Sequence, residues 1–196
     1  MTAQLVEIPG YVAGTWTVDT VHSSVGFAVR HLMISKVRGR FDDFDATFTT
    51  GEDPLDSTVT ATVRMGSVDT GNAQRDAHLN ANDFFAVAEH PTMTFRSTGL
   101  RPARGEGRFE LDGELTIKGV TRPVTFDLEI GGFGPDIFDE SGRGVRAGMV
   151  ASGVIDRTEF GVDTNTPIPG GVALGEKVEI TIEVEAVLNS ASTGSE

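Results

Sequence analysis

The chain has 196 residues and no cysteine, and its 29 acidic against 16 basic residues give a formal net charge of −13 at pH 7. This length suits one domain with a full core, and the lack of cysteine excludes disulfides, thiolate catalysis, iron–sulfur clusters and cysteine-based zinc sites. Such an acidic chain should repel nucleic acid and anionic membrane surfaces unless its basic residues are clustered. We therefore expect no nucleic-acid partner, although one small basic cluster exists at Arg30, Lys36, Arg38 and Arg40.

Residues 1–13 are predicted to form an extension that precedes the domain. They contain no basic n-region and no long apolar run, so they do not resemble a signal peptide. No stretch of the chain approaches the roughly 20 apolar residues that a membrane span needs. We expect a cytoplasmic protein with no integral membrane segment.

Alternation of apolar and polar residues with a period of two dominates the rest of the chain. In 177–188, for example, Val178, Ile180 and Ile182 share one face, opposite Glu179 and Thr181. One apolar face per strand indicates antiparallel pairing over a single core. The eight predicted strands cover residues 15–29, 37–49, 57–69, 91–98, 107–118, 122–130, 144–155 and 177–188.

Three segments lack this alternation. A short helical insertion is predicted around residues 72–88, where Ala, Leu, Asn and Gln gather. Residues 161–176 hold two prolines and four glycines and are predicted to form a mobile flap near one end of the fold. Residues 190–196 are predicted to be a disordered tail, which leaves a single domain over 14–189.

Eight mostly sequential antiparallel strands in one domain close most naturally into a barrel, because closure removes the exposed edges. A two-sheet sandwich is the alternative. At about 3.3 Å per residue the longer strands would make the barrel elongated. The interior of an eight-stranded barrel is wide enough for one slender ligand or for its own side chains.

The stretch VDTVHSSVGFAVRHL, residues 18–32, contains two histidines, a serine pair and an aspartate. On an extended strand His22 and His31 would point to opposite faces and could not bind one metal together. Asp19, His22 and Ser23 would lie too close in an extended chain to orient one another as a triad. No nucleophile elbow, phosphate loop or dinucleotide fingerprint occurs. We predict no catalytic residue, no metal site and no cofactor.

Several motifs read together resemble the YceI-like family. They are Trp16-x-x-Asp19-x-x-His22-Ser23 with Phe27 and His31, VRGRFDDF (37–44), SVDTGNAQRDAHLNANDFF (67–85), HPTMTF (90–95), GELTIKGVTRPVTF (113–126) and DRTEFGV (156–162). The resemblance implies an all-β, elongated lipocalin-like antiparallel barrel that binds a long isoprenoid or another amphiphilic lipid in its interior. Many members of the family are periplasmic. The resemblance supplies no dependable catalytic residues.

The leading hypothesis is a non-catalytic carrier or sequestering protein for a lipid such as an isoprenoid quinone or a polyprenyl phosphate, with a homodimer as one candidate assembly. Burying a tail contributes roughly 0.8 kcal/mol per CH₂, so the tail should set the affinity. The predicted ligand contacts are Val25, Phe27, Val29, His31, Phe41, Phe44, Phe84, Phe85, Met93, Phe95 and Leu115, with Arg38 and Arg75 for a polar headgroup.

Two alternatives remain open at this point. One is an enzyme that acts on an apolar substrate in the same cavity, with His22, His31 or Asp19 as acid or base. The other is a barrel whose interior is filled by its own side chains.

Overall fold

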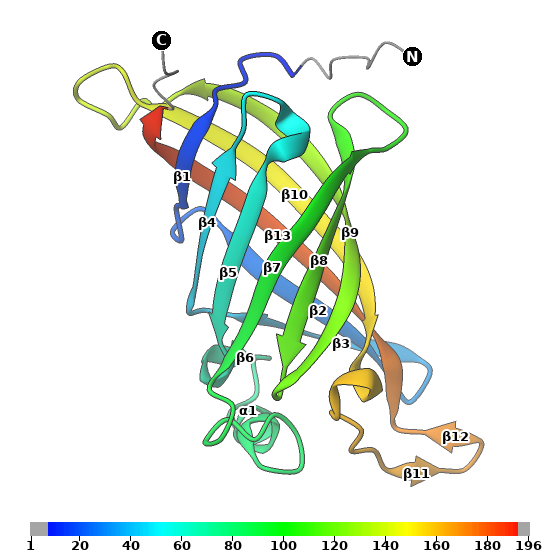
Figure 1. Cartoon of the computed structure of the whole chain (residues 1–196). Helices are drawn as coiled ribbons and strands as arrows, with labels where there is room; N and C mark the ends of the chain where they lie inside the picture. Colours follow the sequence, from blue (N-terminus) through cyan, green and yellow to red (C-terminus); the bar gives the residue numbers. More distant parts are fainter. Residues whose placement is uncertain (1–7, 192–196) are drawn as a thin grey trace.

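An elongated antiparallel β-barrel makes up most of the structure, which is a computed structural model describing residues 8–191 (Figure 1). The strands are β1 (Gly14–Val18), β2 (Ser24–His31), β3 (Ser35–Phe41), β4 (Phe44–Thr50), β5 (Thr58–Arg64), β6 (Val68–Asp69), β7 (Thr92–Pro102), β8 (Arg108–Ile117), β9 (Val120–Pro135), β10 (Val145–Asp156), β11 (Pro167–Ile168), β12 (Gly171–Val172) and β13 (Leu174–Ala191). The helical elements are α1 (Ala73–Asn80) and the short 3₁₀ helices η1 (Pro54–Asp56), η2 (Met65–Ser67) and η3 (Arg157–Phe160). Among these residues no helix is long and apolar enough to cross a membrane.

The barrel is a ring of eight strands in the order β1-β4-β5-β7-β8-β9-β10-β13, closed by pairing between β13 and β1. Strands β2, β3 and β6 extend the sheet from the other half of β13. The fold class predicted from the alternating sequence is therefore confirmed. One end of the barrel, called the terminal end, carries the start of β1 and the end of β13 (Figure 1). The opposite end, called the helix end, carries α1 and the β11–β12 hairpin (Figure 1).

Three of the predicted strands are each broken into two, so their predicted continuity is wrong. In 57–69 the 3₁₀ helix η2 separates β5 from β6. The predicted strand 15–29 consists of β1 and β2, which pair with successive parts of β13 at Val18↔Ala186 and Ser24↔Glu183. The break arises because the Asp19 carboxylate accepts the N–H of Val21 and the Asp19 carbonyl accepts that of His22, which is local turn chemistry. The predicted strand 37–49 is similarly divided into β3 and β4 at residues 42–43.

The break between β1 and β2 leaves the backbone of Glu185 on β13 opposite a gap, and side-chain bonds fill that gap. The Glu185 carbonyl accepts the N–H of Asp19 at 2.9 Å and the hydroxyl of Ser23 at 3.2 Å. The Glu185 N–H donates to the same Ser23 hydroxyl at 3.0 Å. Because backbone groups in a closed sheet need partners, the Ser23 side chain substitutes for a strand residue there.

The helical insertion is confirmed but is shorter than residues 72–88. Helix α1 begins after Asn72, whose side chain accepts the N–H of Arg75 at 3.0 Å, and it ends at Asn80. Turns follow it as far as β7. The segment 161–176 is irregular apart from the β11–β12 hairpin and the start of β13, and its mobility stays a prediction.

The predicted terminal segments lie partly outside the described residues. Residues 1–7 of the predicted extension and 192–196 of the predicted tail are outside the range, while residues 190–191 belong to β13.

The barrel interior contains two apolar clusters. At the terminal end, Trp16 is fully buried, stacks on Phe48 at 5.7 Å between ring centroids, and donates its indole N–H to Thr50 at 2.8 Å. Ala147 and Ala186 complete this cluster. The cluster at the helix end is larger and includes Phe41, Val63, Met65, Val68, Phe84, Leu115, Ile117, Ile155, Phe160 and Val162.

Between the two clusters, inward-facing glycines make room for aromatic rings. Phe95 and Phe126 contact each other edge to face at 5.6 Å. A Cβ on Gly113 would lie 2.3 Å from the Phe95 ring, and a Cβ on Gly153 would lie 2.7 Å from the Phe126 ring. The rings therefore occupy volume that any larger residue at these glycines would need.

We predict that Gly153→Ala destabilises the protein by about 1–3 kcal/mol, since Phe126 must shift to admit the methyl group. Gly148→Ala is the matched control on the same strand, because its Cβ would have no atom within 4 Å. This change should be neutral or slightly stabilising. Denaturant unfolding of both variants measures the difference, and equal effects would show that the ring does not fill the space over Gly153.

Candidate ligand cavity

A cavity of about 430 Å³ lies inside the barrel at the helix end. Its wall is formed by residues of β2, β3, β7, β8, β10 and β13, by η2, by α1 with the turn after it, and by η3 with the segment that follows. None of the buried residues of the terminal-end cluster lines it. The interior is therefore divided into a packed half and a hollow half, and it is not an open tube along the whole barrel.

The apolar wall follows from strand alternation. On β2, Val25, Phe27 and Val29 all line the cavity, and they pair in register with Ile182, Ile180 and Val178 of β13. Successive side chains of a strand point to opposite faces, so every second residue faces inward. The remaining lining residues include Val37, Phe41, Met65, Leu79, Phe84, Phe85, Met93, Ile117, Ile155, Phe160, Val162 and Leu174.

Nine of the thirteen predicted contact residues line this cavity: Val25, Phe27, Val29, His31, Phe41, Arg75, Phe84, Phe85 and Met93. Their contact with a ligand stays a prediction. Phe95 and Leu115 do not line the cavity. They pair with each other two residues beyond the lining residues Met93 and Ile117, on the same faces of β7 and β8, and pack in the cluster around the cavity. Phe44 packs against the surrounding cluster without lining the cavity.

Arg38 lies on the outer face of β3, opposite Ala28 of β2, and is exposed. It is not a cavity residue, because its even position has the opposite parity from Val37, which faces inward. Arg75 does line the cavity, and Thr70 orients it by accepting from its Nε at 2.7 Å and its Nη2 at 2.8 Å.

Arg157, a charged residue buried in the cavity wall, is not among the contact residues predicted from the sequence. Its side chain is 7% exposed. Nε donates to the carbonyl of Gly175 at 2.9 Å, and Nη1 donates to those of Val162 and Thr164 at 2.5 and 3.0 Å. Burial lowers the pKa of this guanidinium, although an arginine so placed keeps its charge near neutral pH. Only its position within DRTEFGV could have drawn attention to it.

The Arg157 Nη2 atom is buried and has no hydrogen-bond partner among residues 8–191. A buried hydrogen-bond donor that is left unpaired costs free energy. An acceptor atom on a bound ligand can pair with this donor, because Arg157 is part of the cavity wall. Arg157 is therefore a buried polar anchor in a largely apolar cavity.

Asp19 and His22 lie together, but outside the cavity wall. His22 Nδ1 is 2.9 Å from the Asp19 carboxylate, so the assumption of an extended chain through these residues is wrong. Arg146 also bonds Asp19 at 2.6 Å, Glu185 at 3.2 Å and Asp136 at 3.2 Å. An acid–base set of Asp19, His22 and His31 is not assembled, because only His31 borders the cavity.

The same cluster is the one place among the described residues where three potential metal ligands meet. Ligand atoms of Asp19, His22 and Glu185 lie within 4.8 Å of one another. The guanidinium of Arg146 already supplies a positive charge to both carboxylates. The predicted absence of a metal stays a prediction, which elemental analysis of the purified protein would check.

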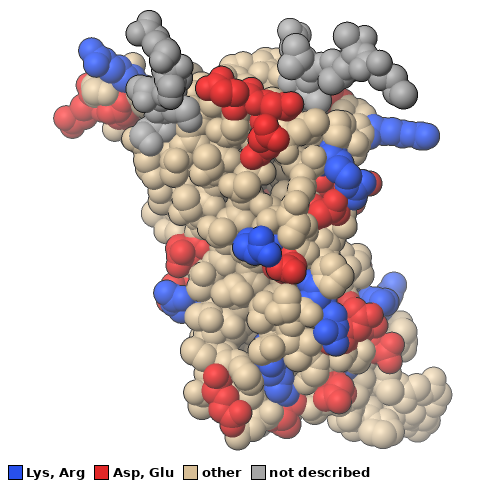
Figure 2. All heavy atoms as spheres, viewed as in Figure 1, with Lys and Arg blue, Asp and Glu red and all other residues tan. Residues whose placement is uncertain are grey.

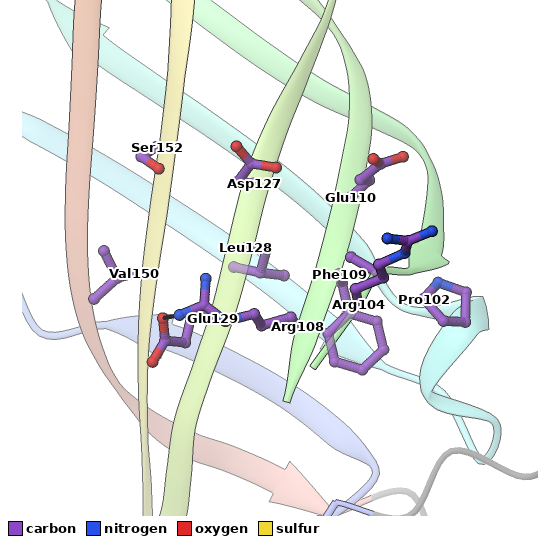
Figure 3. Close-up of a pocket in the computed structure, with 11 residues that line it drawn as sticks. Pro102, Arg104, Arg108, Phe109, Glu110, Asp127, Leu128, Glu129, Val150 and Ser152 are labelled. Atoms are coloured by element: carbon purple, nitrogen blue, oxygen red, sulfur yellow. Dashed lines mark hydrogen bonds and ion pairs between the residues drawn. The ribbon is translucent and has the colours of Figure 1, made fainter. Parts of the chain in front are cut away.

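A larger hollow of about 740 Å³ lies on the outside of the barrel (Figure 3). It is bordered by the β7–β8 loop and by β8, β9 and β10, with side chains including Arg104, Arg108, Glu110, Asp127 and Glu129. Arg108 is 2.6 Å from Glu129, so part of its charge is already paired. An apolar ligand would gain little free energy by moving from water into an open, polar depression whose charges are already paired.

A closed eight-stranded antiparallel barrel with an apolar internal cavity at one end is the architecture of lipocalin-like proteins. The YceI-like domain model matches residues 16–186, and the chain belongs to this family. The resemblance noted in the sequence is thus confirmed.

Known proteins similar to this chain agree in fold. Protein YceI of Salmonella newport is 38% identical over 179 residues, which cover 90% of this chain and 88% of that protein. The crystal structure of a Campylobacter jejuni YceI protein is 30% identical with a TM-score of 0.68, covering 82% of this chain and 90% of that one. A polyisoprenoid binding domain from Saccharophagus degradans has a TM-score of 0.63 at 14% identity, covering 91% and 99% of the two chains.

We predict that Asp19→Asn lowers the melting temperature at pH 7 by roughly 2–4 °C, the shift expected for a loss of about 1 kcal/mol in a chain of this length. The Arg146 guanidinium, and then His22, hold the pKa of the Asp19 carboxyl well below its ordinary value. A lowered carboxyl pKa stabilises the fold above the unfolded pKa of about 3.9 and loses that effect as the pH falls below it. The deficit of the variant should therefore be full above about pH 5 and shrink in more acidic buffer. Asp127→Asn, at an exposed position of β9, is the control and should show no such trend.

Proposed function

We propose that this protein binds one amphiphilic lipid of the isoprenoid type in the cavity at the helix end, and carries or sequesters it without catalysing a reaction. The observation that carries the proposal is an apolar cavity of about 430 Å³ with a single buried, incompletely bonded guanidinium in its wall. The polyisoprenoid binding domain from Saccharophagus degradans, which shares the fold, supports the choice of ligand class.

The size and lining of the cavity favour a single apolar tail. Pockets of about 300–1,000 Å³ hold small-molecule ligands, and this one is walled mainly by apolar side chains from six strands. Each buried CH₂ contributes roughly 0.8 kcal/mol before ordering costs. Affinity is therefore set mainly by the tail.

The inner end of the cavity limits the tail length. Phe95 and Leu115 lie beyond the last lining residues of β7 and β8, and Phe126 backs Phe95 edge to face. A tail longer than the cavity must displace these rings, which costs packing energy in a dense interior. We infer a preference for tails that end below this aromatic layer.

The polar end of the ligand is assigned to Arg157. An oxygen acceptor placed against Nη2 satisfies a buried charged donor, and hydrogen bonds to charged groups contribute about 1.5–3 kcal/mol. His31, Thr164 and Asn165 also border the cavity and provide further polar contacts. The headgroup therefore lies toward the helix end with the tail pointing into the barrel.

The proposal of a carrier without catalysis rests on the distribution of acid–base groups. His31 lines the cavity, whereas Asp19 and His22 lie at the break between β1 and β2. His78 also lines the cavity, but its carboxylate partner Asp83, 2.8 Å away, is not a lining residue, and both side chains are more than half exposed. Inside the barrel, His31 has no carboxylate among residues 8–191 hydrogen-bonded to it, so it lacks the oriented pair that acid–base catalysis employs, and the His78–Asp83 pair lies in solvent.

Val25→Trp should leave a folded protein that no longer retains lipid, because the indole takes up cavity volume that the tail needs. Ser24→Trp is the matched control, since Ser24 is the neighbour of Val25 on β2 and its side chain is exposed on the outer face of that strand. Lipid that co-purifies with each variant is extracted and measured by mass spectrometry, beside a thermal melt. If Val25→Trp unfolds the protein while Ser24→Trp does not, the cavity is closed in solution and the carrier proposal fails.

Arg157→Lys should reduce the preference for a polar head. The wild-type protein should bind geranylgeranyl phosphate more tightly than the corresponding hydrocarbon by about 1.5–3 kcal/mol, the contribution of a charge-assisted hydrogen bond. The variant keeps the positive charge but loses the Nη2 donor, so this difference should fall by about half or more. Affinity for the hydrocarbon is the internal control for an intact cavity. An unchanged preference would place the headgroup elsewhere.

A further inference from the structure

The turn between β2 and β3 is built from residues that its backbone disfavours. Leu32 and Met33 are its two central residues, with φ of 50° and 61°, and the N–H of Ile34 donates to the carbonyl of His31 at 3.1 Å. This four-residue turn lies in a three-residue loop between the paired residues His31 and Ser35, and its two positive-φ positions are ones that Asn and Gly usually occupy. Leucine and methionine there are unfavourable for folding, and such outliers are found at functional positions.

The same residues expose apolar side chains at the apex of the hairpin. Leu32, Met33 and Ile34 are 39%, 57% and 82% exposed. Isolated exposed apolar residues are ordinary on a protein surface, but three consecutive ones at a convex tip form a patch. They contribute little to the core, so packing does not account for their presence.

This tip adjoins the wall of the cavity. His31 lines the cavity, and the N–H of Leu32 donates to the carbonyl of Ala173, another lining residue, at 2.7 Å. The β11–β12 hairpin next to it adds the exposed Val172. Residues 164–175 form an uncharged run in a chain in which 23% of residues are charged. The hairpin appears in Figure 2 as an uncharged protrusion at the lower right.

Basic side chains lie immediately behind the apolar tip. Arg30 and Lys36 occupy paired positions next to the turn, and Arg38 follows on β3. All three are on the outer face of the β2–β3 hairpin, with Glu179 bonded to Lys36 at 2.5 Å. A protein of net charge −13 therefore carries a basic patch where its apolar tip ends. Charges further away than about 8 Å are largely screened at physiological ionic strength, so the local patch governs contact with a surface.

We propose that the β2–β3 tip and the β11–β12 hairpin form a docking surface for a lipid bilayer. The apolar apices enter the interfacial region while Arg30, Lys36 and Arg38 face anionic headgroups. The opening of the cavity then faces the acyl region, and a lipid tail moves between bilayer and barrel without crossing water. This inference rests on the proposed function, since it describes how the cavity is filled.

A bilayer fits these features better than a protein partner does. The surface is two protruding tips, one of them backed by positive charge, rather than a groove or a flat face, and it adjoins residues that line the cavity. Insertion of apolar tips combined with electrostatic attraction is how proteins bind reversibly at a membrane surface.

The test is co-sedimentation of the full chain with vesicles of phosphatidylcholine containing phosphatidylglycerol, and with vesicles of phosphatidylcholine alone. Binding should be stronger to the anionic vesicles and should weaken with salt. Ile34→Asn should weaken it about tenfold, since a side chain of this size loses its burial. Ile137→Asn is the matched control: Ile137 is also 82% exposed, but it lies in the β9–β10 loop at the terminal end, so binding should be unchanged.

A double change, Leu32→Asn with Met33→Gly, separates docking from folding. These residues suit the turn, so the melting temperature should be maintained or raised while vesicle binding falls. Lipid already held in the cavity should be retained in detergent solution by Ile34→Asn as well as by wild type. If Ile34→Asn loses vesicle binding but retains lipid in its cavity, the docking surface is supported. If the wild-type protein retains no lipid, the proposed function itself is contradicted.

Three results would overturn the docking surface. In the first, the wild-type protein binds neither kind of vesicle. In the second, Ile34→Asn and Ile137→Asn bind vesicles equally well. In the third, the wild-type protein binds no vesicles but self-associates with increasing concentration, and Ile34→Asn abolishes this self-association. The last result would assign the tip to a second copy of the chain.

Discussion

The structure depends on how the long strand β13 is paired along both of its edges. Its 18 residues face β10 on one side, and on the other side they need a partner of similar length. The chain provides β1 and β2 with a turn between them, and Ser23 and Asp19 bond the backbone of Glu185 where the strands leave off. An unpaired backbone group between β1 and β2 would be costly. Because these bonds satisfy the Glu185 backbone, β1 can close the barrel while β2 continues to the helix end. Ser23, Asp19 and His22, which suggest catalysis in the sequence, therefore belong to the turn that joins β1 to β2 beside β13.

Division of the interior follows from the same arrangement. At the terminal end, Trp16 and Phe48 are packed between β1, β4 and β13, and small residues such as Ala147 and Ala186 allow close approach. At the helix end the β2–β3 hairpin, the turn after α1 and η3 surround a space that their side chains do not fill. Phe95 and Phe126 separate the two regions. Stability and ligand binding are thus assigned to different layers of one barrel.

Strand alternation is sufficient to predict which residues of a strand face the barrel interior. The odd positions of Val25, Phe27 and Val29 predict that they face inward, as they do. The same rule excludes Arg38 from the cavity, although its charge alone suggests a headgroup contact. Phe84 and Phe85 could be assigned to the interior only as large apolar residues, because the turn that carries them has no period.

Other features depend on contacts between residues distant in the sequence. Arg157 bonds carbonyls up to 18 residues away, and its unpaired nitrogen is evident only once the segment after η3 is folded over it. The break at Asp19 was missed because turn chemistry outweighed the alternation that continued through it. The size of the cavity is likewise a property of packing across eight strands, which no single stretch of sequence contains.

The aromatic layer has a consequence for how this barrel diversifies. Residues on its hollow side have few packing partners, so substitutions there change the shape of the binding space at small cost to the fold, while substitutions on the packed side are eliminated by instability. Gly113 and Gly153 fix where that boundary lies, because their missing side chains seat Phe95 and Phe126. Relatives that keep both glycines are expected to preserve the barrel while drifting in ligand, and a lineage that replaces either glycine must move the boundary and with it the depth of the site.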